Sequence, residues 1–278
     1  MTYRTVIHQA NLPTGHRERL SSLGELQQGK GYLLLHHREP LALEDLRQPL
    51  GCDINTLPLK FDPTQARLFI TDLDSTLVAI ETIDELAAML NLRAQVSAIT
   101  EKAMAGELDF AAALKERVAL LEGLPESVLE QVFHEKMKLN PGAKETLAWL
   151  KQRGVFIAVV SGGFTFFTDR LRQALPIDDA HACQLEIKQG RLTGRLTGTI
   201  VDKHVKAEFL QQLCQKLAIN PEQAVAMGDG ANDIPMLAMA GMGIAYHGHG
   251  ITRNHADVLI DHGDWHDVRY LLLEGLND

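Results

Sequence analysis

Residues 68–76 read LFITDLDST, an apolar run followed at once by two aspartates that stand two positions apart. A short, continuous apolar run is typical of a strand buried on both faces of a parallel sheet. Asp72 and Asp74 would then follow the carboxyl end of that strand, the edge where open α/β sheets bind their ligands. This segment therefore predicts a parallel α/β sheet and a candidate site at its edge.

Four more apolar runs repeat the pattern along the chain: FIAVVS (156–161), AVAMG (224–228), MGIAY (242–246) and DVLI (257–260). Segments with the periodicity of amphipathic helices separate them, as expected when crossover helices join parallel strands. The fold class is therefore predicted to be α/β, with a Rossmann-like parallel sheet at its core.

The stretch between the first strand and FIAVVS, positions 72–155, is far longer than one crossover requires. Ahead of the crossover helix at 142–154, this stretch contains four helix-period segments, at 83–91, 92–106, 110–123 and 126–137. We interpret the four as a helical-bundle cap, inserted into the core at about residues 79–140.

Residues 1–65 are interpreted as a small α+β module. RTVIHQ (4–9) and GYLLLHH (31–37) have the composition of strands, and HRERLSSLGELQQ (16–28) between them has a helical pattern. Two prolines punctuate the segment that follows, so we place a domain boundary near residue 65 and a core domain at 66–278. Because every candidate residue lies after the boundary, we expect the module to be dispensable for the chemistry.

The composition excludes several classes of protein. The 278 residues include 27 Lys and Arg against 36 Asp and Glu, a net charge of −9 without a basic stripe, so no nucleic-acid partner is expected. The longest uncharged stretch, 234–252, contains a proline and four glycines, so no membrane span is expected either. Three cysteines in no CxxC pair suit a reducing compartment, and the opening segment, MTYRTVIHQANLPTGHRERL, lacks the core of a signal peptide. We expect a cytoplasmic protein.

Polar side chains follow the other predicted strands as well. Ser161 ends FIAVVS just before two glycines. Asp229, Asn232 and Asp233 follow AVAMG, and Lys206 lies on the segment that leads into it. Because the carboxyl ends of parallel strands share one edge, these groups are predicted to converge with the Asp-x-Asp pair on one crevice.

This set of residue types suits the hydrolysis of a phosphate ester. Asp72 can attack phosphorus to form an aspartyl-phosphate, while Asp74 acts as general acid and then as general base. Two negative charges ~4 Å apart repel by about 4 kcal/mol at an effective dielectric of about 20, so attack on a phosphate requires local cations. One Mg²⁺, Lys206, the Ser161 hydroxyl and the amides of the glycine turn would supply the positive charge.

Four elements match the signature motifs of haloacid dehalogenase-like (HAD-like) phosphatases: DLDST (72–76), VSGG (160–163), Lys206 and GDGAND (228–233). The chain resembles this family over about residues 66–278. Longer segments are similar, more narrowly, to the phosphoserine phosphatases: DLDSTLVAIETIDELA (72–87), FAAALKERVALLEGL (110–124), VVSGGFTFF (159–167) and VAMGDGANDIPMLAMAG (225–241). The resemblance implies a Mg²⁺-dependent hydrolase that converts O-phospho-L-serine to L-serine and phosphate, the last step of L-serine biosynthesis.

The resemblance also implies roles for individual residues. Asp72 would be the nucleophile and Asp74 the general acid and base. The Mg²⁺ ion would bind the Asp72 carboxylate, the Asp74 backbone carbonyl and the Asp229 carboxylate, and Asp233 would support that site.

The phosphate and the rest of the substrate would each have their own contacts. Ser161, Gly162 and Lys206 would hold the phosphate, and Asn232 would contact the phosphate or its attacking water. From the cap, the resemblance implies three further contacts: Glu81 for the substrate ammonium, Arg117 for its carboxylate and Phe110 as an apolar lid. Arginine suits a bidentate grip on a carboxylate.

Two segments differ from the family pattern. HGHGITRNHA (247–256) lacks the Lys-Pro that often follows the last core strand in relatives. The N-terminal module, 1–65, resembles in abbreviated form the ACT-like module attached to many bacterial relatives.

Other functions stay open at this stage. A HAD-like phosphotransferase, or a phosphatase for phosphothreonine or phosphohomoserine, would share all four motifs and differ only in the pocket of the cap. An amino-acid-sensing regulatory protein is a third reading, against which the intact aspartate pair argues. The sequence also leaves open whether the chain forms a homodimer.

Overall fold

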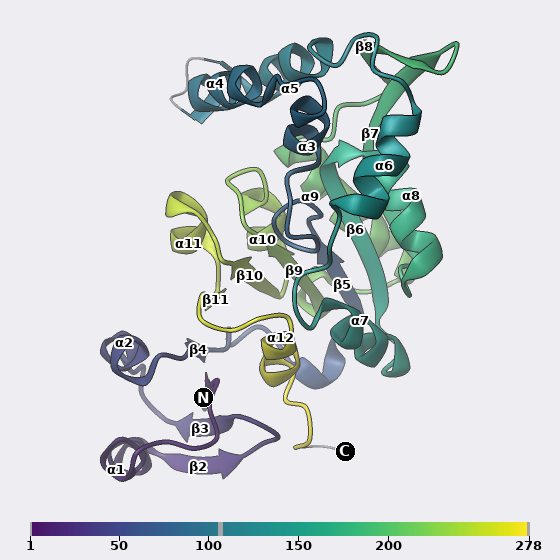
Figure 1. Ribbon diagram of the computed structural model, residues 1–278. Coiled ribbons are helices and arrows are strands. Elements are labelled where there is room, and N and C mark those ends of the chain that lie inside the picture. Colours follow the sequence, from purple (N-terminus) through teal and green to yellow (C-terminus); the bar gives the residue numbers. More distant parts are fainter. Residues whose placement is uncertain (1, 105–107, 277–278) are drawn as a thin grey trace.

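The computed structural model describes residues 2–104 and 108–276 and contains two sheets (Figure 1). The larger sheet has the strand order β11-β10-β9-β5-β6-β7-β8. Its neighbouring strands pair in parallel, except that β7 and β8 form an antiparallel hairpin. The strands are β5 (Leu68–Thr71), β6 (Phe156–Phe164), β7 (Asp179–Lys188), β8 (Arg191–Thr197), β9 (Ala224–Gly228), β10 (Met242–Tyr246) and β11 (Val258–Ile260). The predicted α/β class, with a parallel sheet at its core, is confirmed.

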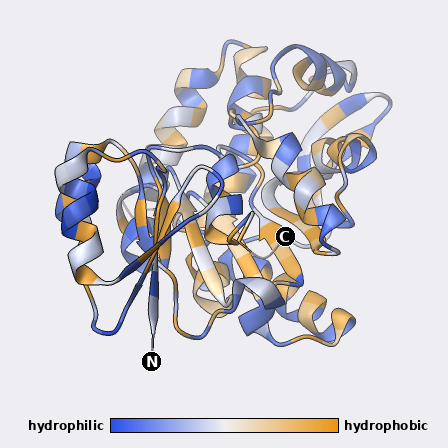
Figure 2. Cartoon of the chain, turned by 90° about the horizontal axis from the view of Figure 1, so that it is seen from below, coloured by the Kyte–Doolittle hydropathy of each residue, from blue (hydrophilic) through white to orange (hydrophobic). Residues whose placement is uncertain are grey.

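Helices cover this sheet and explain its apolar strands. Every residue of β5, β9 and β10 is buried, which is why these strands read as unbroken apolar runs. In Figure 2 orange, hydrophobic segments are frequent in the middle of the molecule, and blue, hydrophilic segments lie mostly at the outside. The covering helices are α7 (Ala143–Gln152), α8 (Thr165–Ala174), α9 (Lys203–Leu217), α10 (Ile234–Met239), α11 (Gly250–His255) and α12 (His266–Leu271).

Four helices between β5 and β6 stand over the edge at which β5 ends (Figure 1). They are α3 (Thr82–Ala88), α4 (Arg93–Met104), α5 (Phe110–Ala119) and α6 (Ser127–Glu135). An antiparallel bridge between Val78 and Leu139 joins the two chain segments that enter and leave this bundle. On its far side, the backbone of Leu192 in β8 bonds to Gly123 and Leu124, so the hairpin supports the bundle. Residues 105–107 of the expected cap lie outside the described residues.

The N-terminal residues form a second, antiparallel sheet with the strand order β2-β3-β1-β4. Its elements are β1 (Tyr3–Ile7), α1 (Thr14–Leu23), β2 (Glu25–Gln28), β3 (Leu33–His37), α2 (Arg47–Leu50) and β4 (Ile54–Thr56), with short 3-10 turns at Glu44–Leu46 and Pro63–Gln65. A third 3-10 turn, Pro221–Gln223, directly precedes β9 in the core. This β-α-β-β-α-β sequence is that of a split βαβ motif. The module is therefore α+β, and its resemblance to ACT-like modules stays a prediction.

The helix expected over residues 16–28 is wrong in its second half. Helix α1 ends at Leu23, and ELQQ pairs with β3 as strand β2. A Cβ on Gly24 would lie 2.0 Å from the carbonyl oxygen of His36, so the glycine lets the two backbones approach. The sequence pattern missed the strand because its stabilising partner, β3, lies beyond the next turn.

The two faces of the N-terminal sheet bury their side chains in different cores. Ile7, Leu33 and Leu35 pack under α1 and α2 in a small core of their own. Val6 and Leu34 belong instead to the large core of the seven-stranded sheet. Side chains alternate between the faces of a strand, so adjacent residues of β1 and β3 connect the module to both cores.

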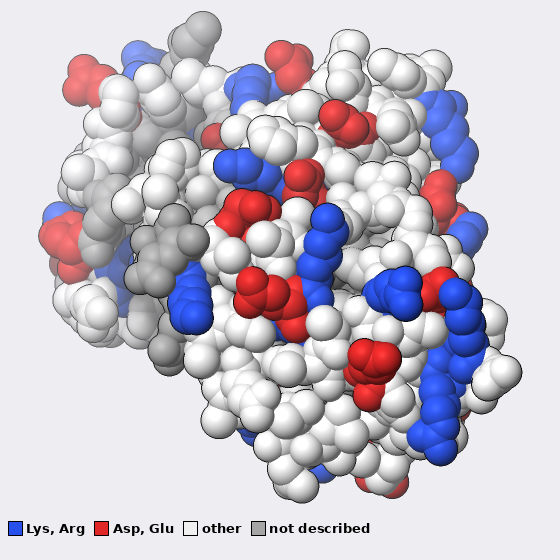
Figure 3. Space-filling model, turned by 90° about the horizontal axis from the view of Figure 1, so that it is seen from above, with Lys and Arg blue, Asp and Glu red and all other residues white. Residues whose placement is uncertain are grey.

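Seen from above the cap, acidic and basic side chains are interspersed on the face shown in Figure 3. Among the described residues, no helix combines the length and the apolar character that a membrane crossing requires.

Candidate active site

Asp72 follows β5 directly and is held by the backbone around it. Its N–H donates to the carbonyl oxygen of Met227 in β9 (2.9 Å), and its Oδ1 accepts from the N–H of Leu73 (2.8 Å). Two positions after Leu73, Ser75 has φ +54°, a left-handed conformation, so the chain turns sharply after the strand. Only 5% of Asp72 is exposed. The predicted position of the Asp-x-Asp pair at the sheet edge is thus the observed one.

Lys206, at the start of α9, is fully buried between two carboxylates. Its Nζ lies 2.8 Å from Asp72 Oδ1 and 2.7 Å from Asp233 Oδ1. Burial lowers the pKa of Lys206, but the charges of Asp233 and Asp72 outweigh this, so its pKa is raised overall. The ammonium is therefore a fixed cation beside the candidate nucleophile.

Asp74 lies within hydrogen-bond reach of the first cap helix. Its two carboxylate oxygens accept from the backbone N–H (3.2 Å) and the hydroxyl (3.1 Å) of Thr82. Burial raises the pKa of Asp74 well above its ordinary value, and the negative charges of Glu81 and Asp72 add to the rise. A carboxyl group that retains its proton in this way is suited to act as a general acid.

The glycine turn after β6 approaches the aspartates closely. Ser161, 1% exposed, accepts at its Oγ from the N–H of Gly163 (2.8 Å). A Cβ on Gly163 would lie 2.8 Å from Asp74 Oδ2, and one on Gly162 would lie 2.9 Å from Cζ of Phe110. Side chains at these two positions would displace groups that line the site.

Three carboxylates gather at the ends of β5 and β9. Oxygens of Asp72, Asp229 and Asp233 lie within 4.8 Å of one another. Burial raises the pKa of Asp72 well above its ordinary value; Asp233 and Asp229 add to the rise, and Lys206 opposes it. Burial also raises the pKa of Asp229. Three buried carboxylates against one ammonium leave an excess of negative charge, and hard oxygen ligands of this kind fit Mg²⁺.

The cap contributes groups of both signs to the cleft. Glu81 Oε1 accepts from the Ser75 hydroxyl (2.6 Å). Arg117 Nε donates to the carbonyl oxygen of Ala113 (3.3 Å), and its terminal nitrogens form no ion pair with a carboxylate of the described residues. Burial lowers the pKa of Arg117, while Asp84 and Glu81 raise it. Burial also raises the pKa of Glu81. Phe110 begins α5, whose N-terminus Asp109 caps.

The predicted residues surround one cleft with an empty volume of about 560 Å³, counted to its open mouth. Every predicted site residue lines it except Lys206 and Asp233, which are fully buried behind Asp72. Asn232 is part of this lining, from the loop after β9. The structure therefore brings together all the residues that the sequence singled out.

Sequence reasoning missed several supporting residues. The Thr76 hydroxyl donates to Asp229 Oδ1 (3.0 Å), and Thr82 bonds to Asp74 as described. Thr76 stands within the DLDST motif, so its place beside the aspartates was a usable signal. In the atypical HGHG segment, the N–H of His249 donates to the carbonyl oxygen of Asp229 (3.0 Å), a contact that no sequence pattern indicates.

The fold and this constellation define a class of hydrolase. Residues 69–238 match the model of the haloacid dehalogenase-like hydrolases, and the chain belongs to that family. Within the family its similarity is to proteins named phosphoserine phosphatase, so the resemblance drawn from the motifs is confirmed. The Polaromonas protein is 45% identical over 77% of this chain and 92% of its own length. The Archaeoglobus fulgidus protein is 48% identical over 75% of this chain, but over only 60% of its own length.

Solved structures give the same assignment. A HAD family hydrolase from Salmonella enterica has a TM-score of 0.88 at 30% identity and covers 98% of this chain and 99% of its own. A probable phosphoserine phosphatase from Vibrio cholerae has a TM-score of 0.83 at 33% identity, with coverage of 98% and 86%. A phospho-aspartyl intermediate analogue of a phosphoserine phosphatase has a TM-score of 0.69 at 39% identity, over 73% of this chain and 97% of that one.

Proposed function

We propose that the protein hydrolyses O-phospho-L-serine to L-serine and phosphate, with Asp72 as nucleophile and Mg²⁺ as cofactor. The observation that carries the proposal is the position of Asp72 Oδ1, 2.8 Å from the buried ammonium of Lys206, in a cleft that also holds Glu81 and Arg117. One end of the cleft suits a phosphate, and the other suits the two charges of an amino acid.

In the first step, an Asp72 oxygen forms a bond to phosphorus while the bond from phosphorus to the serine oxygen breaks. Asp74 gives its proton to that departing oxygen, which its raised pKa favours. Lys206, the Ser161 hydroxyl and the N–H groups of the glycine turn offset the charge of the phosphoryl oxygens.

In the second step, water attacks the phosphorus of the aspartyl-phosphate, and the bond to Asp72 breaks. Asp74, now ionised, takes a proton from the water, so it returns to its starting state as free phosphate forms. Asn232 lines the cleft on the same side, where it can bond to the phosphate or to the attacking water.

The carboxylates of Asp72 and Asp229, together with the Asp74 backbone carbonyl, would hold the Mg²⁺ ion, and Asp233 would support them through Lys206. When bound, the ion would neutralise charge on the phosphoryl group. Without it, buried like charges oppose ionisation of Asp72.

Glu81 and Arg117 would bind the ammonium and the carboxylate of the substrate, and Phe110 would cover its apolar part. The same proposal divides the chain into a module at residues 1–65 and a core domain at 66–278, with the cap inserted into the core domain at about 79–140. This reaction fits a cytoplasmic enzyme of amino-acid biosynthesis.

The test is phosphate release from O-phospho-L-serine with Mg²⁺, with and without EDTA. Asp72→Asn removes the nucleophile and little volume, so it should abolish turnover while the circular dichroism spectrum stays unchanged. Near-normal turnover by this variant would exclude the covalent mechanism. Phosphothreonine as substrate and homoserine as phosphate acceptor, run in the same assay, separate the proposed hydrolase from its relatives.

A further inference from the structure

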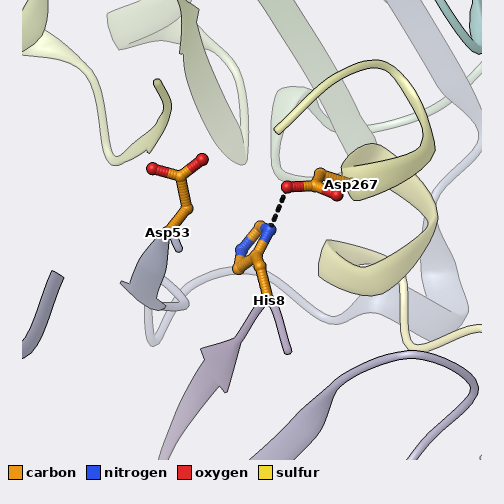
Figure 4. Close-up of side chains that lie close together, drawn as sticks. All are labelled: His8, Asp53 and Asp267. Carbon is orange, nitrogen blue, oxygen red and sulfur yellow. Dashed lines mark hydrogen bonds and ion pairs between the residues drawn. The ribbon is translucent and has the colours of Figure 1, made fainter. Parts of the chain in front are cut away.

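A cluster of polar residues lies where the N-terminal sheet meets the core, outside the lining of the cleft. His8 at the end of β1, Asp53 before β4 and Asp267 on α12 have ligand-type atoms within 4.8 Å of one another (Figure 4). The set could be taken for a metal site, but its atoms have protein partners. Asp53 Oδ2 accepts from three backbone N–H groups at 3.0–3.1 Å, those of residues 261–263, and its Oδ1 pairs with Arg47.

The histidine is likewise engaged at both nitrogens. Its Nε2 accepts from the Asn55 amide (3.0 Å), which assigns the ring proton to Nδ1, where it donates to Asp267 Oδ2 (2.8 Å). The Asn55 amide also bonds to both the N–H and the carbonyl oxygen of Leu259 in β11 (2.9 and 2.8 Å). Both carboxylate oxygens of Asp53 and both ring nitrogens of His8 therefore have protein partners, and the cluster fixes a backbone segment of the core.

The fixed segment, residues 261–263, has no regular secondary structure and lies two positions before a buried tryptophan, Trp265. Trp265 is 0% exposed, and its indole N–H donates to the carbonyl oxygen of Thr76 (2.9 Å). The Thr76 hydroxyl in turn donates to Asp229 Oδ1 (3.0 Å). On its other side, the Trp265 carbonyl oxygen accepts from the Thr146 hydroxyl of α7 (2.9 Å).

We infer that Trp265 is a positioning residue for the Asp229 carboxylate, and that Asp53 of the N-terminal module holds Trp265 in place for this role. The inference rests on the proposed function in one respect, since Asp229 is there a ligand of Mg²⁺. Hydrogen bonds behind a metal-binding carboxylate orient it before the ion arrives. The module is then part of the apparatus that shapes the metal site, in contrast to the dispensable role expected from the sequence.

The experiment measures Mg²⁺ binding by calorimetry without substrate, alongside thermal unfolding. Trp265→Phe retains an aromatic ring and removes the N–H donor, and it should raise the Mg²⁺ dissociation constant about two- to tenfold. The increase in the dissociation constant should be limited, because the Asn140 amide also donates to the Thr76 carbonyl oxygen (2.7 Å) and would remain in the variant. Trp149→Phe is the matched control, because Trp149 on α7 is only partly buried against the same core and lies beside Arg153. It should leave the constant unchanged.

The contribution of the module is tested by Asp53→Asn, with Asp45→Asn as its control. Asp45 also pairs with an arginine of the module, Arg19, but in an exposed position. Asp53→Asn should weaken Mg²⁺ binding about two- to tenfold, and the double variant with Trp265→Phe should show less than the product of the two effects, since both act through one chain of contacts. If Asp53→Asn does not fold, Asp267→Asn keeps an acceptor for the histidine and should shift the constant in the same direction.

An unchanged dissociation constant in Trp265→Phe would overturn the positioning role. If Asp53→Asn lowers the melting temperature but leaves the Mg²⁺ dissociation constant unchanged, the role assigned to the module is refuted. A wild type that binds Mg²⁺ but does not hydrolyse phosphoserine would refute the proposed substrate and leave this inference standing. A wild type that binds no Mg²⁺ would refute both.

Discussion

Replacement of Arg117 by alanine should lower activity on phosphoserine much more than activity on p-nitrophenyl phosphate, which has no carboxylate. The guanidinium projects from α5 into the lining of the cleft, and its terminal nitrogens form no ion pair with a described carboxylate. They are therefore available to the substrate. A hydrogen bond to a charged group is worth about 1.5–3 kcal/mol, so the ratio of the two kcat/KM values should fall by roughly ten- to hundredfold.

The assay compares kcat/KM for both substrates in the wild type, Arg117→Ala, Arg117→Lys and Arg93→Ala. Lysine keeps the charge but not the planar fork, so it should restore only part of the selectivity. Arg93 serves as the control because it belongs to the same cap but pairs with Glu85 in α3, outside the lining of the cleft. Its replacement should leave the ratio unchanged.

Equal losses on both substrates would refute the reasoning for Arg117. That outcome would mean that the arginine organises the cap, where Asp84 and Glu81 are its electrostatic partners, and does not bind the substrate. Glu81→Gln provides an independent arm, because it should lower the same ratio through the substrate ammonium. A ratio unaffected by both substitutions would place the recognition of the amino acid elsewhere in the cleft.

Three further outcomes are expected. Lys206→Ala should lower kcat/KM for both substrates alike, since phosphate is common to them; a loss confined to phosphoserine would contradict the role of the ammonium. Gly163→Ala should lower kcat on both substrates with little change in melting temperature, because its Cβ would lie 2.8 Å from Asp74 Oδ2; unchanged kcat would show that Asp74 tolerates the displacement. Burial raises the pKa of Tyr246 from 10 to about 12, so stability present below pH 10 should be lost as pH rises to 12, by up to about 3 kcal/mol. Urea unfolding across this pH range measures the free energy of unfolding of the wild type and of Tyr246→Phe. If the difference between the two free energies does not change with pH, the assigned role of Tyr246 is contradicted.

Much of the catalytic cleft was predictable because its residues stand beside buried strands. Asp72 and Asp229 each follow a strand whose every residue is buried, and such strands are legible as apolar runs. The rule that parallel strands end at a common edge then converts positions in the sequence into proximity in space. The roles of Glu81 and Arg117 came from a resemblance, because a charge on a helix surface has the same local pattern whether or not it binds a substrate.

Local sequence patterns did not predict an element that is stabilised by residues distant in the sequence. ELQQ has the composition of a helix, but the antiparallel ladder with β3 makes it a strand. Its backbone groups find partners in β3, and this pairing outweighs the local preference.

The amino-acid order alone thus specifies the α/β core, the aspartate pair and the polar residues that follow the other core strands, because each is encoded by a local pattern next to a strand. The contacts behind the site are different in kind. Trp265 bonds to a residue 189 positions away, and Asp53 bonds to backbone groups 208–210 positions away. A tryptophan between two short elements, or an aspartate before a short strand, has no periodicity that indicates such a partner. These bonds exist only because the N-terminal sheet and α12 are packed against the same side of the core, and that packing is a property of the folded chain as a whole.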